Sequence, residues 1–344
     1  VLNRVTGISY PAYGGEPAET VIYSYDSCAN GKGRLCSLID KTGTLSYGYD
    51  SHGRVLTKSQ ATQGLTQSIA YGYNAFGQQS RMTLPSGKVV SYGYANNRPA
   101  SLSYDSQLIA HNADYEPFGG IGEWGWGNDT PASPNKYLRL VDLDGRVGRI
   151  DAGIGQDPVV IGYDAASRIT ALQRLTGNQI DPARSMSYGY DQLDRLTAGT
   201  PGAGNPAAAV SYAYDGVGNR LTSTIAGSVT QYGYGATSHR LNTLTGAASL
   251  SYTYDATGNR TADGNQAWAY AGNNRPAHIT IAAPAATVQT GINALGQRVS
   301  KTVNGVTTRF VYDEAGRLIG EYENSGEPLQ ETLWLNDVPV AVIQ

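Results

Sequence analysis

A phrase of about nine residues, Tyr-x-Tyr-Asp-x-x-Gly-Asn-Arg, recurs along the chain and constrains its fold more than any other feature. It is complete at residues 212–220 and 252–260, and altered copies begin at residues 47, 188 and 310. Most copies lie about 20 to 24 residues apart. A repeat of this period indicates an array of one supersecondary unit, in which each copy packs on its neighbours. The second tyrosines of successive copies are Tyr25, Tyr49, Tyr73, Tyr94, Tyr190, Tyr214, Tyr234, Tyr254 and Tyr270.

Each copy predicts a β-hairpin. Tyr252 and Tyr254 are two residues apart, so both rings project from the same face of a strand. Asp255 and Gly258 suit the first and last positions of a type I turn, and Asn259 begins the return strand. Gly, Asn and Asp interrupt the chain too often for helices, so the predicted fold class is all-β, an antiparallel sheet of repeated hairpins. The repeat-turn residues are Tyr25, Asp26, Tyr49, Asp50, Tyr163, Asp164, Tyr190, Asp191, Tyr214, Asp215, Gly218, Tyr254, Asp255, Gly258, Tyr312, Asp313 and Gly316.

The aromatic composition indicates a thin sheet rather than a thick core. The chain has 25 Tyr against 3 Phe and 4 Trp. Tyrosine combines an apolar ring with a hydroxyl that prefers water or a polar partner. A dry core would use Phe, Leu and Ile, so this usage favours an extended or thin-walled β-structure.

Charge and hydropathy predict that the chain has no nucleic-acid partner and no membrane span. Only 15% of the residues are charged, the net charge is −3, and no run rich in Lys or Arg could form a phosphate-binding face. No apolar run reaches the roughly 18 residues that a membrane span requires. The chain opens at Val1 as the return half of a repeat, so we expect it to be a piece of a longer protein.

The repeat rhythm predicts three parts of one continuous segment. Residues 1–104 hold a first run of hairpins, 105–160 an irregular cross-over rich in Trp, Pro and Gly, and 161–344 a second run. The cross-over contains Trp124 and Trp126. They form either a packed corner between two runs of sheet or an aromatic binding platform for a sugar or peptide.

Cys28 and Cys36 are the only cysteines, and they flank the first repeat turn. They could face each other across the hairpin as a disulfide, and two reduced thiols fit the sequence equally well. A zinc site would need further ligands, and His52 is the nearest histidine. We therefore expect no metal here.

The sequence offers no catalytic site and no cofactor motif. Its four histidines lie in different hairpins without metal-ligand spacing, and no nucleophile elbow or phosphate-binding loop is present. The repeated aspartates resemble glycosidase carboxylates only superficially, because a catalytic pair is needed once and a turn former in every hairpin. The chain is therefore predicted not to be an enzyme; a β-propeller hydrolase is the remote alternative.

The phrase resembles the signature of the YD-repeat, or Rhs-repeat, family. Finer features also match, among them Tyr115-x-Pro117-Phe118-Gly119 and the closing segment 334–342. The resemblance implies a spiralling ribbon of hairpins that forms the wall of a hollow shell, so this chain would be a fragment of a larger β-cocoon.

The same resemblance implies partners. In bacterial members the shell encloses a C-terminal toxin, as in polymorphic toxins delivered by type VI secretion and in insecticidal toxin complexes; related shells occur in teneurins. The expected partners are the rest of the same polypeptide, the enclosed toxin and the secretion machinery, in a bacterial protein that is exported or delivered to cell surfaces. The alternative is a carbohydrate- or cell-surface-binding module. The isolated piece is expected to self-associate through unpaired strand edges.

The chain also departs from bacterial members of the family. Their terminal core carries a self-cleaving Asp-Pro-x-Gly-Leu motif. The Asp-Pro pairs of this sequence, at residues 157–158 and 181–182, do not continue in that way.

Overall fold

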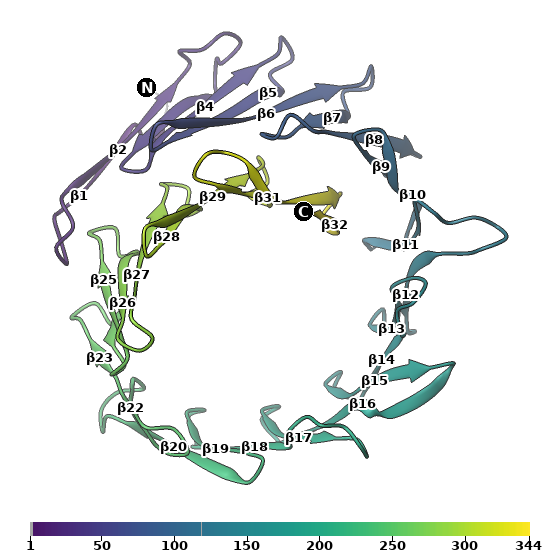
Figure 1. Ribbon diagram of the computed structural model, residues 1–344, viewed down its shortest axis with the longest axis vertical. Helices are drawn as coiled ribbons and strands as arrows, with labels where there is room; N and C mark the ends of the chain where they lie inside the picture. The colour runs from purple at the N-terminus through teal and green to yellow at the C-terminus, as the bar shows by residue number, and fades with distance from the viewer. Residues whose placement is uncertain (1–2, 118) are drawn as a thin grey trace. The chain divides into compact units, whose positions relative to one another are not determined.

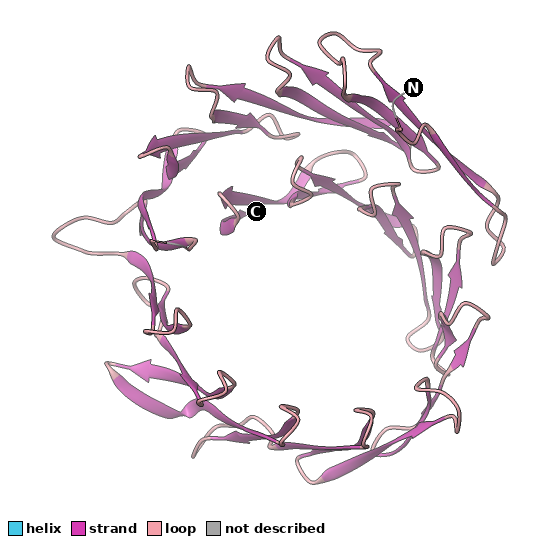
Figure 2. Cartoon of the chain, turned by 180° about the vertical axis from the view of Figure 1, so that it is seen from behind, coloured by secondary structure: helices cyan, strands magenta, loops and turns pink. Residues whose placement is uncertain are grey.

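The computed structural model describes residues 3–117 and 119–344, and it is built from β-hairpins. Neither described range contains a helix (Figure 2). The strands form two antiparallel sheets, of 22 and 10 strands, so the all-β prediction is confirmed. The start of the chain at Val1 and the Phe118 position of the Tyr115–Gly119 motif lie outside the described residues.

The chain divides into two compact units. Unit 1 comprises Val1–His111, Ala256–Thr261 and Asn265–Gln344, and unit 2 comprises Asn112–Asp255 and Ala262–Gly264. The two units are defined by contacts between residues in space. The boundaries expected at residues 104 and 160 rest on the spacing of the repeats in the sequence, and they stay a prediction. β10 (Gln107–Tyr115) and β24 (Arg260–Ala262) cross the boundary between the units.

Unit 1 is made of two runs of strands that are far apart in sequence. The C-terminal run, green to yellow in Figure 1, lies along the N-terminal run, which is purple to blue. The N-terminal run consists of β1 (Gly7–Tyr10), β2 (Glu19–Tyr25), β3 (Leu35–Asp40), β4 (Gly43–Tyr49), β5 (Val55–Thr62), β6 (Leu65–Tyr73), β7 (Gln79–Thr83), β8 (Val89–Ala95) and β9 (Arg98–Tyr104). The C-terminal run consists of β25 (Gln266–Tyr270), β26 (Pro276–Ile281), β27 (Ala286–Ile292), β28 (Arg298–Val303), β29 (Val306–Tyr312), β30 (Leu318–Glu323), β31 (Pro328–Leu335) and β32 (Val338–Ile343).

Unit 2 is a single run of hairpins. Its strands are β11 (Ile121–Trp126), β12 (Lys136–Val141), β13 (Val147–Asp151), β14 (Val159–Tyr163), β15 (Ile169–Thr176), β16 (Gln179–Tyr190), β17 (Leu196–Pro201), β18 (Val210–Tyr214), β19 (Arg220–Ile225), β20 (Ser228–Tyr234), β21 (Leu241–Gly246), β22 (Leu250–Ser251) and β23 (Thr253–Tyr254).

Burial differs sharply between the units. Of the buried apolar side chains in the described residues, only Ile121, Trp124 and Leu175 belong to unit 2. In unit 1 the two runs bury apolar side chains, among them Ile69, Leu102, Ile319 and Leu333. The strands of unit 2 must therefore be held by something other than a dry core, as the tyrosine-rich composition predicts.

The repeat places a register shift at the second tyrosine of each copy. On β4, Gly48 pairs with Thr57 whereas Tyr49 pairs with Val55, so the return strand holds one extra residue. The same shift occurs at Tyr163, Tyr190 and Tyr214, among other copies. Such a bulge bends the strand and fixes the register of its hairpin.

Candidate functional site

The repeat turn is a hydrogen-bonded clamp around one aspartate. At Asp50, Oδ1 accepts hydrogen bonds from the backbone N–H groups of His52 and Arg54, each at 2.9 Å. The Arg54 Nε donates to Asp50 Oδ2 at 2.6 Å. The Gly53 N–H donates to the Asp50 carbonyl, and Gly53 has φ +77°. This is the geometry of a three-residue hairpin loop closed by a left-handed residue, which favours glycine.

The same clamp is present in the turns that begin at Asp142, Asp164, Asp191 and Asp313. At Asp164, the backbone N–H and the guanidinium of Arg168 hold the pKa of the carboxyl below its usual value. Gly218, Gly258 and Gly316 all have positive φ in their turns. The arginine four residues later thus binds Asp50, Asp164, Asp191 and Asp313, a role of these turn aspartates that we did not predict. At Asp215 the residue in that position is Asn219, whose Nδ2 donates to Asp215 Oδ2 at 2.8 Å.

A second set of contacts joins each hairpin to the next. The Tyr73 hydroxyl donates to the Val55 carbonyl of the preceding hairpin at 2.8 Å, and the Arg54 guanidinium lies 4.4 Å from the centre of the Tyr73 ring. The second tyrosines that donate to the preceding return strand in this way are Tyr49, Tyr73, Tyr94, Tyr163, Tyr190, Tyr214, Tyr234, Tyr254, Tyr270 and Tyr312.

The arginine completes the connection. Arg195 Nη1 donates to the Asp215 carbonyl of the next turn at 2.7 Å, and its guanidinium lies 4.8 Å from the centre of the Tyr214 ring. Arg168 makes the same two contacts with Asp191 and Tyr190. We call this chain of Asp–Arg–Tyr contacts the repeat ladder. Its hydrogen bonds link each hairpin to the next at the strand ends that carry the repeat turns.

Trp334 takes the place of tyrosine in the last copy. Its Nε1–H donates to the Leu318 carbonyl at 2.9 Å, and the Arg317 guanidinium lies 5.6 Å from the centre of one of its rings. An indole N–H and a phenol hydroxyl are both donors on an apolar ring, so either satisfies the position.

Uncharged copies keep the clamp by changing both of its members. Asn74 pairs with Gln78 at 2.7 Å, and Asn293 pairs with Gln297 at 3.1 Å, each through Nδ2 and Oε1. An Asp–Arg pair, an Asn–Gln pair or, at Asp215 and Asn219, an Asp–Asn pair thus bridges the two positions. The sequence shows which residue stands four after each turn former, but the type of that residue does not follow from the turn former alone.

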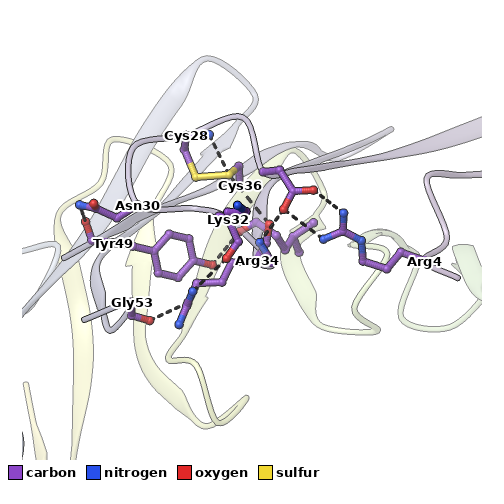
Figure 3. The surroundings of a disulfide bond; sticks show 11 residues. Arg4, Cys28, Asn30, Lys32, Arg34, Cys36, Tyr49 and Gly53 are labelled. Carbon is purple, nitrogen blue, oxygen red and sulfur yellow. Dashed lines mark hydrogen bonds and ion pairs between the residues drawn. A yellow bond between two sulfur atoms is a disulfide. The ribbon is translucent and has the colours of Figure 1, made fainter. Parts of the chain in front are cut away.

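The first turn is longer and is closed by a disulfide. Cys28 and Cys36 form an S–S bond of 2.04 Å, with their Cα atoms 5.6 Å apart (Figure 3). Asp26 pairs with Arg4 rather than with Arg34. Arg34 still reaches the next turn, where its Nε donates to the Gly53 carbonyl at 2.8 Å. The disulfide therefore closes this turn, whereas an Asp–Arg clamp closes several of the later turns.

Within unit 1, turns of the C-terminal run meet the N-terminal run through buried polar contacts, which we call the seam. Asn273 donates to Glu19 at 3.0 Å, and the Ala294 N–H donates to Asp40 at 2.6 Å. In both contacts the partners are 254 residues apart in sequence. One further contact joins Lys58 Nζ to the Asp313 carbonyl at 2.8 Å. Three repeat turns of the C-terminal run thus bind β2, β3 and β5 of the N-terminal run, in the order of the chain.

The seam buries charged side chains that no sequence pattern predicts to be buried. Burial lowers the pKa of Lys58, whose side chain is 4% exposed, although Glu314 and Asp313 oppose that shift. Arg309 is 2% exposed and donates to the Thr62 carbonyl at 2.6 Å. These cations are satisfied by carbonyl oxygens, as buried donors must be.

The comparisons with known proteins agree with this hairpin architecture. The sequence model of the teneurin YD-shell family matches residues 158–331, half of the chain. The chain belongs to the teneurin YD-shell family. The resemblance that the repeat phrase predicted is therefore confirmed.

Solved structures show the same fold as this YD-shell chain. A crystal structure of TcdB2-TccC3 matches with a TM-score of 0.57 at 12% identity, over 93% of this chain and 22% of that one. The same pair without its hypervariable C-terminal region gives 0.54 at 12% identity, over 95% and 24%. A Photorhabdus luminescens Tc holotoxin pore gives 0.53 at 13% identity, over 91% and 21%. The YD-shell chain thus spans less than a quarter of these proteins. No curated protein matches its sequence.

The tryptophans of the predicted cross-over form a cluster in unit 2 of this YD-shell chain. The Trp124 side chain is 2% exposed, and its ring stacks on Tyr137 with centroids 3.8 Å apart. Trp126 packs edge-on against Trp124 and donates its Nε1–H to the Ala152 carbonyl at 3.0 Å. Tyr137 therefore covers a face of the Trp124 ring, and only part of the Trp126 side chain is accessible to a ligand.

In the described part of the YD-shell chain, His, Cys, Asp and Glu side chains form no group of three or more that could hold a metal ion. The same part of the chain includes no helix with the length and apolar character of a membrane span.

Proposed function

We propose that this chain is a wall segment of a shell that encloses a polypeptide, and that it performs no catalysis of its own. The repeat ladder carries this proposal. It joins neighbouring hairpins of unit 2 by hydrogen bonds, and only three apolar side chains are buried among the described residues of that unit. A sheet held in this way needs no second layer, and a one-layer wall leaves the most room for contents.

The enclosed polypeptide, in this proposal, is a toxin domain at the C-terminal end of the same protein. Membership of the YD-shell family and the fold shared with TcdB2-TccC3 support it. Delivery of such a protein by a bacterium, through type VI secretion or as a toxin complex, would place it outside the cytoplasm. The Cys28–Cys36 disulfide is consistent with that compartment.

The alternative hypothesis is a carbohydrate- or cell-surface-binding module. It would need an accessible aromatic platform, and the burial of Trp124 against Tyr137 weighs against one at that place. We also propose that the isolated chain self-associates, because β1 and β32 each have one pairing partner in the described residues. A strictly monomeric species in sedimentation at high concentration would contradict this.

Protease protection tests the shell function. The native polypeptide that carries this chain is digested with a non-specific protease, and surviving fragments are identified by mass spectrometry. We expect a segment outside the repeats to survive in the parent protein. It should become accessible when Arg168→Ala and Arg195→Ala break the ladder.

Gln192→Ala is the matched control, because Gln192 is exposed in the turn between Asp191 and Asp194 and has no part in the ladder. It should leave protection unchanged. Equal digestion of the segment in the parent and in the ladder variant would reject the shell function. A glycan-binding assay on the parent chain decides the alternative, since measurable binding lost on Trp126→Ala would favour the binding module.

A further inference from the structure

Glu331 is a buried carboxylate without a cationic partner. Its side chain is 2% exposed, and it accepts hydrogen bonds from the hydroxyls of Tyr322 at 2.8 Å and Tyr104 at 3.1 Å. No Lys, Arg or His in the described ranges forms an ion pair with it. Burial and the charge of Glu331 raise the pKa of Tyr104 to about 12. A charge taken from water is costly unless an opposite charge compensates it, so this arrangement favours a bound cation.

A cavity of about 390 Å³ adjoins this carboxylate, within the size range of small-ligand sites. Pro85, Pro328, Leu329 and Ile343 give its lining apolar surface, and the rest of the lining is mainly polar, from Ser86, Lys88, Tyr104, Glu327, Glu331 and Gln344. Lys88 also lines the cavity, but its Nζ is held by Asp105 Oδ2 at 2.7 Å. The cavity therefore combines apolar surface with a buried carboxylate that forms no ion pair in the described residues.

We propose that this cavity binds the side chain of a lysine from a partner polypeptide. The four-carbon stem of lysine would pack on the apolar surface, and its ammonium would reach the remaining acceptor positions of Glu331. A guanidinium fits less well, because it prefers both oxygens of a carboxylate in a fork, and each oxygen here already accepts a tyrosine hydroxyl. This site goes beyond the wall function, since it names a contact with a second polypeptide.

The affinity for a lysine peptide tests the site. The probe is the pentapeptide acetyl-Gly-Gly-Lys-Gly-Gly-amide, and the control peptide has norleucine in place of lysine, which keeps the apolar stem without the charge. Isothermal titration should give a Kd at least about tenfold lower for the lysine peptide, the range of a charge-assisted contact. Glu331→Gln should abolish that preference, and Glu327→Gln, an exposed neighbour at the cavity, should retain it.

A second variant keeps the test decisive if Glu331→Gln does not fold. Leu329 is exposed and lines the same cavity as Glu331, so Leu329→Lys would place an ammonium in the cavity with the carboxylate. It should block the lysine peptide while leaving the fold intact. Equal affinity of the parent for both peptides would overturn the proposal, as would a preference that survives Glu331→Gln or Leu329→Lys.

Discussion

At the scale of single residues, the two tyrosines of a repeat have different tasks. In residues 188–190, the Tyr190 hydroxyl donates to the Ile169 carbonyl at 2.7 Å, whereas the structure gives the Tyr188 hydroxyl no hydrogen bond to the described residues. The sequence identifies both as strand residues with rings on one face. It cannot tell them apart, because the acceptor belongs to the preceding hairpin.

This difference predicts unequal effects of the same substitution. Tyr190→Phe should destabilise the chain by about 1 kcal/mol, because it leaves the Ile169 carbonyl without its donor. Tyr188→Phe, the matched control, should be close to neutral. Urea denaturation monitored by circular dichroism measures both. Equal effects would show that the hydroxyl does not contribute to the ladder.

The charged clamp predicts a pH dependence of stability. The backbone N–H and the guanidinium of Arg195 hold the pKa of Asp191 below its usual value, against the opposing effect of burial. A carboxyl with a lowered folded pKa stabilises the folded state above its unfolded pKa of about 4, and that stabilisation is lost as the pH falls through the folded pKa.

The neutral pair Asn293–Gln297 provides the variant that tests this. Asp191→Asn with Arg195→Gln should fold and should be less stable than the parent at pH 7. The difference in free energy of unfolding between the two proteins should shrink as the pH falls from about 5 to 2. A difference that stays constant over this range would assign the acid sensitivity to other carboxyls.

At the scale of the element, the hairpin turn depends on one left-handed residue. Gly218 has φ +95°, and Gly216 in the same turn does not have a positive φ. A Cβ atom added at either position would meet no heavy atom within 4 Å. The two glycines therefore differ in backbone conformation and not in available space.

Gly218→Val should destabilise this hairpin by roughly 1 to 2 kcal/mol, because an L-residue is strained in the left-handed region. Gly216→Val should cost less. Gly258, with φ +94°, should behave as Gly218 does. Hydrogen exchange of β18 and β19 locates the effect. Equal costs at Gly216 and Gly218 would mean that φ is not the cause.

The turn closed by the disulfide predicts that stability depends on the redox state of Cys28 and Cys36. Cys28 and Cys36 close a loop with a sequence separation of 8 residues. Cys28→Ser with Cys36→Ser should lower stability by about 2 to 3 kcal/mol, because the unfolded chain regains the freedom of that loop. A reducing agent should have the same effect on the parent and none on the variant. No response of the parent to reduction would contradict the prediction.

At the scale of the whole molecule, the sequence predicts the hairpins and not the seam. The turn signal is local, since Asp255 and Gly258 are three residues apart, and so the all-β fold could be predicted. The ladder was partly visible, because Arg195 follows Asp191 by four residues, but its second partner lies one repeat away. The seam joins residues 254 apart. No periodicity indicates such a pair, and charged side chains such as Lys58 are ordinarily expected at the surface.

Arg309 offers the sharpest test of the seam. It donates to the carbonyls of Thr62 and Asn324 and to the Asn324 side chain. Burial lowers its pKa, and no carboxylate in the described residues pairs with it. Arg309→Met would keep the apolar volume but leave these buried acceptors unsatisfied, at about 1 to 3 kcal/mol each. We therefore expect the stability of unit 1 to fall by at least about 2 kcal/mol.

Hydrogen exchange separates this effect from a general loss of charge. Arg309→Met should reduce protection in β5 and β29, and protection in β15 and β16 of unit 2 should stay as in the parent. Arg184→Met removes an exposed ion pair with Asp157 and should change stability by less than about 1 kcal/mol. If Arg309→Met were as mild as Arg184→Met, the carbonyls of the seam would be satisfied by water. The Arg309 hydrogen bonds would then contribute little to holding the two runs of unit 1 together.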